Sequence, residues 1–239
     1  MENMQRILTG TFQINTWIVP LCENKVFVVD PAACITTGDE NAIIDYLKYN
    51  DLEPVGFFLT HGHFDHITGT APLKAEWTNA PLACHKADCE IAGENAFSAQ
   101  APILQYMGLL EMLPALKDLP EPDAPLNGGE RLNSVFGGTH LSDKVNDCLS
   151  SWLVIHTPGH SDGSCCLYNE KQKTLISGDT VFFRAWGRTD LPGGNEKKFI
   201  KSLKYLKDSL PDDTKVYPGH DAYGFTLGKD LELIFKFLL

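Results

Sequence analysis

Residues 55–66 read VGFFLTHGHFDH, an apolar run followed at once by three histidines and an aspartate. Residues 55–59 are apolar throughout, which is typical of a strand buried on both faces of a sheet. The cluster THGHFDH at residues 60–66 therefore follows the carboxyl end of a buried strand, which is where α/β folds place their sites.

The spacing within this cluster indicates a metal site. His61 and His63 are separated by one residue, so an extended backbone sends both imidazoles to the same side, where they can share one ion. Asp65 and His66 follow at the start of the next predicted helix. They are turned away from the first pair, free to bind a second ion or to orient the ligands of the first.

Regular elements are predicted on both sides of this strand. In the N-terminal third we expect strands at residues 6–12, 14–21 and 26–30, and a helix at 38–50 with a capping box formed by Thr37 and Glu40. In the C-terminal third we expect strands at 151–157, 164–169, 174–179 and 215–217, and helices at 196–210 and 227–238. Two halves of similar order predict a sandwich of two sheets with helices outside.

The middle of the chain breaks this pattern. Residues 91–135 contain an apolar helical stretch and then the Pro-rich connection PEPDAPLNGG at 120–129, for which no regular structure is expected. We interpret 91–135 as a mainly helical insertion packed on a single domain of residues 1–239. A lid over the site or a subunit contact is the sharper alternative, because Met and aromatic residues suit an adaptable surface.

Composition limits the classes of partner and location. The net charge of −11 and the lack of a basic cluster argue against nucleic acid. No signal peptide or apolar span is present in the sequence, so we expect a cytoplasmic protein without a membrane partner, and a homo-oligomer is left open. The seven cysteines are odd in number and never spaced Cys-x-x-Cys, which predicts reduced, mostly buried thiols.

Three further candidate ligands each end a predicted strand in a Gly-containing loop. They are His160 in TPGHSDG, Asp179 in SGD and His220 in YPGHD. Together with the first cluster they make seven ligands from four segments, more than one tetrahedral zinc needs. His85, His140 and His156 stay unassigned, since an isolated histidine at a strand end is more often a hydrogen-bonded structural residue.

The count predicts a pair of divalent metals. We assign one ion to His61, His63 and His160, the other to Asp65, His66 and His220, and a bridging position to Asp179. Imidazole and carboxylate without thiolate suit zinc, our first expectation, and also iron or manganese. Two ions about 3.5–4 Å apart can hold a hydroxide and polarise a carbonyl or phosphoryl oxygen, so hydrolysis is predicted. Asp65 is our catalytic candidate, as a ligand that also orients the hydroxide.

In these motifs the sequence resembles the metallo-β-lactamase superfamily, whose HxHxDH motif stands here at residues 61–66. The resemblance covers the chain except its middle and implies an αββα sandwich with a dinuclear site on one edge. Asp30, in VVDPA, is similar to a structural aspartate of the family near the site. Asp179 stands where true class B β-lactamases carry cysteine or serine, which argues against antibiotic hydrolysis.

Within that superfamily, GRTDLPGG at 187–194 and PGHDAYGFTLG at 218–228 look like compact glyoxalase II-like hydrolases. This resemblance implies cleavage of a small-molecule thioester, such as a hydroxyacylglutathione, by a metal-bridging hydroxide. It also implies a substrate carboxylate contact for Arg188, with an ion pair to Asp190 as the alternative. The chain departs from the larger glyoxalase II enzymes in ending soon after its last ligand and in lacking the tyrosine of this loop.

Other functions use similar residues. HITG after the first motif, GRTD and YPGHD also look like persulfide dioxygenases of the superfamily, which use a single iron and consume oxygen. Lactonase or phosphodiesterase action would use the same ligands. A non-catalytic domain that keeps metal for stability is a third class, which would have to explain a complete ligand set in open Gly-rich loops.

Overall fold

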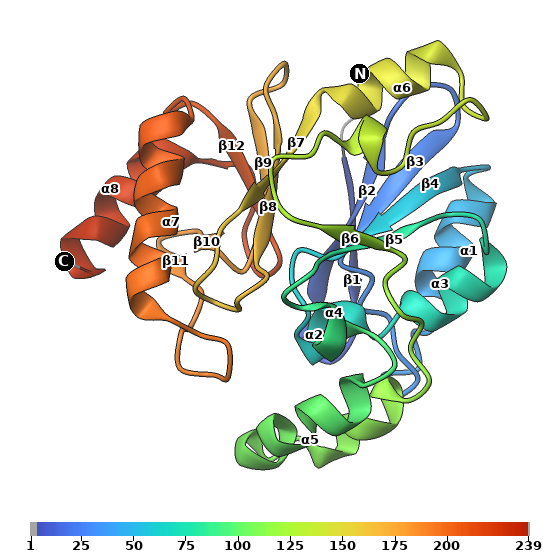
Figure 1. Cartoon of the computed structure of the whole chain (residues 1–239), viewed down its shortest axis with the longest axis horizontal. Coiled ribbons are helices and arrows are strands. Elements are labelled where there is room, and N and C mark those ends of the chain that lie inside the picture. Colours follow the sequence, from blue (N-terminus) through green and yellow to red (C-terminus); the bar gives the residue numbers. More distant parts are fainter. Residues whose placement is uncertain (1–3, 239) are drawn as a thin grey trace.

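The computed structural model describes residues 4–238, which form two β-sheets packed face to face with helices on both outer sides (Figure 1). The first sheet runs in the order β1 (Gln5–Thr9), β2 (Ile14–Pro20), β3 (Lys25–Val29), β4 (Glu53–Phe58), β5 (Leu82–His85) and β6 (Ala124–Leu126). The second runs in the order β13 (Phe225–Thr226), β12 (Lys215–Pro218), β9 (Thr174–Gly178), β8 (Cys165–Asn169) and β7 (Trp152–His156).

Helices form the two outer layers. Figure 1 shows α1 (Ala42–Tyr49) and α3 (Thr70–Glu76) outside the first sheet, and α7 (Glu196–Ser209) and α8 (Leu227–Leu238) outside the second. The predicted four-layer αββα sandwich is therefore confirmed. No helix within residues 4–238 is long and apolar enough to cross a lipid bilayer.

Strand alternation explains how four layers hold together. On β3, Val26 and Val28 pack in the apolar cluster beneath α1, whereas Phe27 and Val29 pack in the cluster between the two sheets. The strands of the second sheet divide their side chains in the same way between the central cluster and the one beneath α7 and α8. Each strand with two apolar faces thus contributes to two of the three buried layers.

The strand that precedes the histidine cluster is central, as its composition predicts. β4 pairs in parallel with β3 on one side and with β5 on the other. After β4 the chain reaches the short helix α2 (Phe64–Ile67) within six residues. Residues 59–63 therefore cross the edge of the sheet at the carboxyl ends of parallel strands.

The middle segment is mainly helical, as expected. It contains α4 (Cys89–Ala92), α5 (Ala96–Met107) and the 3-10 turns η1 (Leu110–Leu116) and η2 (Leu132–Ser134). The Pro-rich connection does not lack regular structure, however: β6 lies inside it and pairs in parallel with β5. An edge strand tolerates Pro125 because its outer side needs no ladder hydrogen bond.

The start of α1 also differs from the prediction. The helix begins at Ala42, four residues later than expected, and no side chain caps it. The Thr37 hydroxyl instead donates to the Asp39 carboxylate and the Cys34 carbonyl, so the capping box does not form. Local polar residues here close a turn before the helix.

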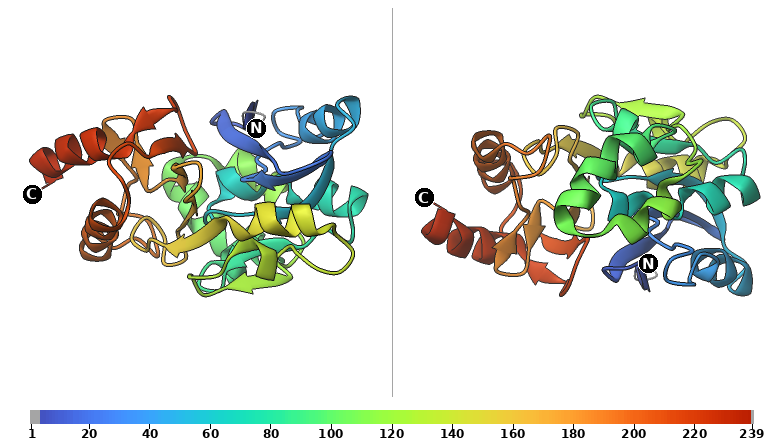
Figure 2. Two further views of the ribbon diagram at one scale, coloured as in Figure 1. Left: turned by 90° about the horizontal axis from the view of Figure 1, so that it is seen from above. Right: turned by 90° about the horizontal axis from the view of Figure 1, so that it is seen from below.

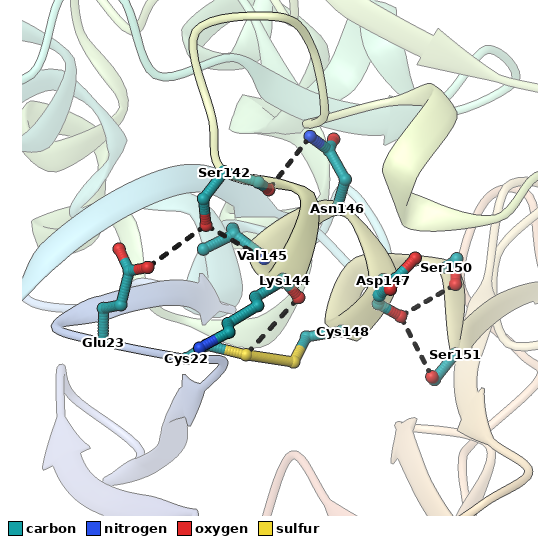
Figure 3. Close-up of a disulfide and its surroundings, with 10 residues drawn as sticks. All are labelled: Cys22, Glu23, Ser142, Lys144, Val145, Asn146, Asp147, Cys148, Ser150 and Ser151. Atoms are coloured by element: carbon teal, nitrogen blue, oxygen red, sulfur yellow. Dashed lines mark hydrogen bonds between the residues drawn. A yellow bond between two sulfur atoms is a disulfide. The ribbon is translucent and has the colours of Figure 1, made fainter.

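One cysteine prediction is wrong. Cys22, after β2, is disulfide-bonded to Cys148 in α6 (Asp143–Ser150), as Figure 3 shows. The two lie 126 residues apart in sequence, so no local spacing could reveal the pair. The other five cysteines are free, and Cys89 alone among them is not fully buried.

Candidate metal centre

The seven predicted ligands meet at one edge of the sandwich. They come from the loops that follow β4, β7, β9 and β12, which the topology brings to the same side of the two sheets. Their ligand atoms form three overlapping sets, each within 4.8 Å: the three-histidine group His61, His63 and His160; the Asp65 group Asp65, His66 and His220; and a linking set of His61, His66 and Asp179.

The side chains of the three-histidine group are almost fully buried. His160 Nε2 lies 2.8 Å from His63 Nδ1 and 3.2 Å from His61 Nε2. Nδ1 of His160 donates to the Arg188 carbonyl, which can only accept, so Nε2 is left with a lone pair. Burial, and then the neighbouring histidines, lower the pKa of both His61 and His63 well below the usual value. The lowered pKa values favour neutral imidazoles at His61 and His63, the form that metal ligation requires.

The Asp65 group is more polar and partly open. His66 Nδ1 donates to Asp30 across 3.0 Å, which directs Nε2 toward Asp65 and Asp179. Burial lowers the pKa of His66, but the carboxylates of Asp179, Asp65 and Asp30 outweigh it and raise that pKa well above its usual value. His220 lies 3.6 Å from Asp65 through Nε2, and its side chain is 21% exposed.

Asp179 stands between the two groups. Its Oδ2 lies 3.6 Å from His160 Nε2 and 3.4 Å from His220 Nε2. Burial opposes ionisation, but the imidazoles of His66 and His220 hold the pKa of Asp179 well below its usual range. Gly219 makes this approach feasible, because a Cβ there would lie 2.6 Å from Asp179 Oδ1.

Three buried ligand atoms indicate that these residues fit a metal. His63 Nε2, His66 Nε2 and Asp179 Oδ1 have no hydrogen-bond partner among the described residues. Buried polar atoms without partners are costly, and cations bound by these ligands would remove that cost. The donor sets of the three-histidine group and the Asp65 group suit a binuclear site for divalent ions, and imidazole with carboxylate does not select one metal.

Asp30 braces the first ligand loop, in line with the structural role its resemblance implies. It adopts a left-handed backbone at φ +50°, directly after β3. Its carboxylate accepts from the Thr60 backbone at 2.7 Å, from the Thr60 hydroxyl and from His66. The backbone of Asp30 is strained, and its buried carboxylate makes several hydrogen bonds. Both features are expected where a residue positions the ligands of a site.

Asp88 is a second brace, which the sequence analysis missed. This carboxylate is 1% exposed and accepts from the Gly62 backbone at 2.9 Å, the Ser161 hydroxyl at 2.6 Å and the Gly163 backbone at 2.7 Å. It thereby ties together the loops that carry all three members of the three-histidine group. The available signal was its place three residues after β5, at the same sheet edge as Asp30.

The middle segment is also tied to the first ligand loop. Gln100 of α5 is fully buried, and its amide nitrogen donates to the Gly62 carbonyl at 2.9 Å and to the Ile91 carbonyl. The right view of Figure 2, from below, shows α5 in green in front of the sheets, on the side of the molecule where Figure 1 places α2. Met107 at the end of α5 lines the pocket described next.

The metal pocket is a hollow of about 290 Å³ above the ligands. It is lined by Phe12, His63, Phe64, Asp65, Met107, His160, Asp179, Phe182, Arg188, Leu191, His220 and Asp221. Arg188 reaches it, but its Nε and Nη2 atoms both donate to the Asp190 carboxylate at 2.7 Å. The loop ion pair left open by the sequence is thus present, and a substrate contact for Arg188 stays a prediction.

The unassigned histidines lie outside the ligand sets. His85 and His156 stack on each other with ring centroids 3.9 Å apart, and His156 Nε2 donates to the Asp162 carbonyl at 2.9 Å. This pair packs beside the loop that carries His160. His140 is an exposed residue, in none of the ligand groups found among the described residues.

Comparison with known sequences agrees with this geometry. A family model described as the metallo-beta-lactamase superfamily matches residues 9–220. A Bacillus subtilis protein named probable metallo-hydrolase YqgX is 30% identical over 217 residues, covering 90% of this chain and 89% of that protein. Hydroxyacylglutathione hydrolase GloC of Haemophilus influenzae is 27% identical over 231 residues, covering 95% of this chain and 94% of that protein.

Solved structures share the fold of this chain. The BLEG-1 B3 metallo-beta-lactamase is similar at TM-score 0.77 and 26% identity, covering 96% of this chain and 97% of its own. TTHA1623, solved in a di-iron-bound form, is similar at TM-score 0.72 and 29% identity, and the match covers 94% of this chain and 95% of that one.

Proposed function

Because the chain belongs to the metallo-β-lactamase superfamily, we propose that its metal centre hydrolyses a thioester of a small acid with a peptide thiol, such as a hydroxyacylglutathione. The named relatives and the ligand sets support the broader assignment as a metal-dependent hydrolase of that superfamily. One observation carries the proposal: seven ligand side chains from four loops converge below a single open pocket with apolar walls.

The residues of the site would have separate roles in hydrolysis. Bound divalent ions of this kind acidify a coordinated water and polarise a carbonyl oxygen. Asp65, at the pocket wall, is placed to accept a proton of the attacking water and to orient it toward an acyl carbon. Water adds its oxygen to that carbon and the carbon–sulfur bond breaks, which leaves a carboxylic acid and a thiol.

The pocket suits a substrate with a good leaving group. Five of the seven ligands line it, and the other ionisable residues in its described lining are Arg188 and Asp221. Arg188 does not release its proton near neutral pH and is paired with Asp190. Asp221 is exposed to solvent. A thiolate needs no dedicated proton donor to depart, whereas an amine does, so this lining favours a thioester over an amide.

Phe12, Phe64, Phe182 and Leu191 form the apolar part of the wall. Such side chains accommodate a short acyl chain and keep bulk water from the reacting carbon. The name of the Haemophilus influenzae relative supports the same substrate class, because the two chains align over nearly their full lengths. The di-iron form of TTHA1623 supports iron as an alternative to zinc.

The test is hydrolysis of S-lactoylglutathione by protein purified without added metal, followed with a thiol-reactive dye. We expect thiol release that stops when a chelator removes the metal and returns when zinc, iron or manganese is added back. A cephalosporin serves as a comparison substrate, because one similar structure is a β-lactamase. Oxygen uptake with glutathione persulfide, without thiol release from the thioester, would instead make the protein a dioxygenase.

A further inference from the structure

A second hollow opens directly beside the metal pocket. This side groove of about 550 Å³ is lined by Arg6, Leu8, Thr11, Phe12, Gln13, Asn15, Asp221 and Ala222. Phe12 and Asp221 line both hollows, so they mark the boundary between two adjacent spaces. A substrate that presents its acyl group to the metals can therefore extend its remaining part into the side groove.

Arg6 is fixed within the groove while keeping most of its donors available. Its guanidinium carbon lies 4.7 Å from the centre of the Tyr223 ring, a cation–π arrangement. The structure gives it one hydrogen bond, from Nη1 to Asn15 Oδ1 at 3.4 Å. Since a guanidinium carries five N–H donors, several remain for a ligand carboxylate.

Hydrogen bonds hold Asn15, which lines the groove, in place. Asn15 Nδ2 donates to the Pro218 carbonyl at 3.0 Å and to the Asp221 carbonyl at 3.2 Å. This side chain connects the first sheet to the loop that carries His220. Arg6 and Asp221 are therefore positioned relative to the metal centre by the same residue, which is the preorganisation a specific subsite needs.

Among residues 4–238, Arg6 and Asp221 are the charged residues that line the groove, and their charges have opposite sign. We propose that the side groove binds the thiol carrier of the substrate, and that this carrier bears a zwitterionic amino-acid or peptide group. Arg6 would take its carboxylate and Asp221, at the boundary, its ammonium group. This inference rests on the proposed thioesterase function and goes beyond it by naming the subsite and the class of carrier.

The same charges argue against a nucleotide carrier. A phosphate-rich thiol brings several negative charges, whereas the groove offers one guanidinium opposed by one carboxylate on a chain with net charge −11. A peptide thiol carries no phosphate groups, so binding it does not require several cationic side chains in the groove.

Three thioesters of the same hydroxy acid test the inference: with glutathione, with the short neutral thiol N-acetylcysteamine, and with coenzyme A. In the unaltered protein we expect the highest kcat/KM with glutathione. Arg6→Gln should lower the ratio of kcat/KM for glutathione to that for N-acetylcysteamine by about tenfold, the loss of one charge-assisted contact. Arg6→Lys should lower it less, and Asp221→Asn should lower it about threefold, as a partly solvated ion pair would.

Lys201→Gln, on the outer helix α7, removes the same charge far from the groove and should leave the ratio unchanged. Measurements of melting temperature and metal content would check that each variant is folded and contains its metal ions. An unchanged ratio in Arg6→Gln with thiol still released, or a preference for coenzyme A, overturns the inference alone. No thiol from any of the three esters overturns the proposed function as well.

Discussion

The two halves of the metal centre are built differently. The three-histidine group is almost fully buried, and its loops are joined by one carboxylate, Asp88. Members of both groups line the metal pocket, but the Asp65 group is the more exposed of the two, with the side chains of His220 and Asp65 21% and 12% exposed, and it contains a carboxylate ligand and is held by Asp30. The difference suggests a division of labour: the first group holds its ion in place, and the second exposes its ion to substrate.

The electrostatics follow the same division. Burial keeps His61 and His63 neutral, with their pKa values well below normal. The second group surrounds His66 with three carboxylates, which raise its pKa above normal despite burial. An ion there replaces protons as the counter-charge of the carboxylates. Each prediction below changes one half and asks whether the other follows.

The largest effect is expected from the residue shared by both halves. Asp179→Ala removes the carboxylate between the two groups and leaves several imidazoles facing an empty space. We predict loss of both metals and a fall in kcat on the order of 10³-fold or more. Metal analysis of the purified variant checks this. Retention of both ions would show that Asp179 does not bridge.

His220→Ala should separate the halves. Among the seven ligands, its side chain lies against Asp65 and His66 of the second group and the shared Asp179. We predict that one ion per chain is retained, while kcat falls by about 10²-fold because the substrate-facing ion binds poorly. Titration with a competing chelator measures the two affinities. Equal weakening of both would mean that the halves form one cooperative unit.

Asp88→Asn should affect the opposite half. The change keeps the shape but replaces one acceptor oxygen by an NH₂ group, which faces N–H and O–H donors. We predict that the affinity of the three-histidine group for its ion falls about tenfold, with a smaller effect on the Asp65 group. The matched control is Asp162→Asn, an exposed aspartate in the same His160 loop. Similar metal affinities in the two variants would count against a positioning role.

Acidification should distinguish the halves without any mutation. A proton competes with a metal at each imidazole, and it does so at higher pH where the pKa is raised. The pKa values of His66 and His220 are raised, whereas those of His61 and His63 are lowered. As pH falls from 8 toward 5, the Asp65 group should lose its ion first. Metal content after dialysis at stepped pH measures the order, and simultaneous loss would contradict it.

The sequence predicted the parts of this arrangement that depend on local pattern. An apolar strand before THGHFDH, and histidine or aspartate after three other strands, indicate ligands at one sheet edge because parallel strands share that edge. The αββα layers were predicted from the similar order of elements in the two halves and from the resemblance to the metallo-β-lactamase superfamily.

Features that depend on distant contacts could not be found in this way. Asp88 bonds to residues 73 and 75 positions later, at Ser161 and Gly163, and nothing local marks it as a brace. The Cys22–Cys148 pair joins the turn after β2 to α6, which was itself not predicted. The strand β6 was hidden because proline content argues against strands in general but not against an edge strand.

The most direct measurement is a crystal structure of the metal-loaded protein with anomalous scattering recorded at the absorption edge of the bound metal. Two peaks about 3.5–4 Å apart are predicted, one at the three-histidine group and one at the Asp65 group, with Asp179 between them. A single peak at the three-histidine group in the fully loaded, active protein would contradict the two-ion centre.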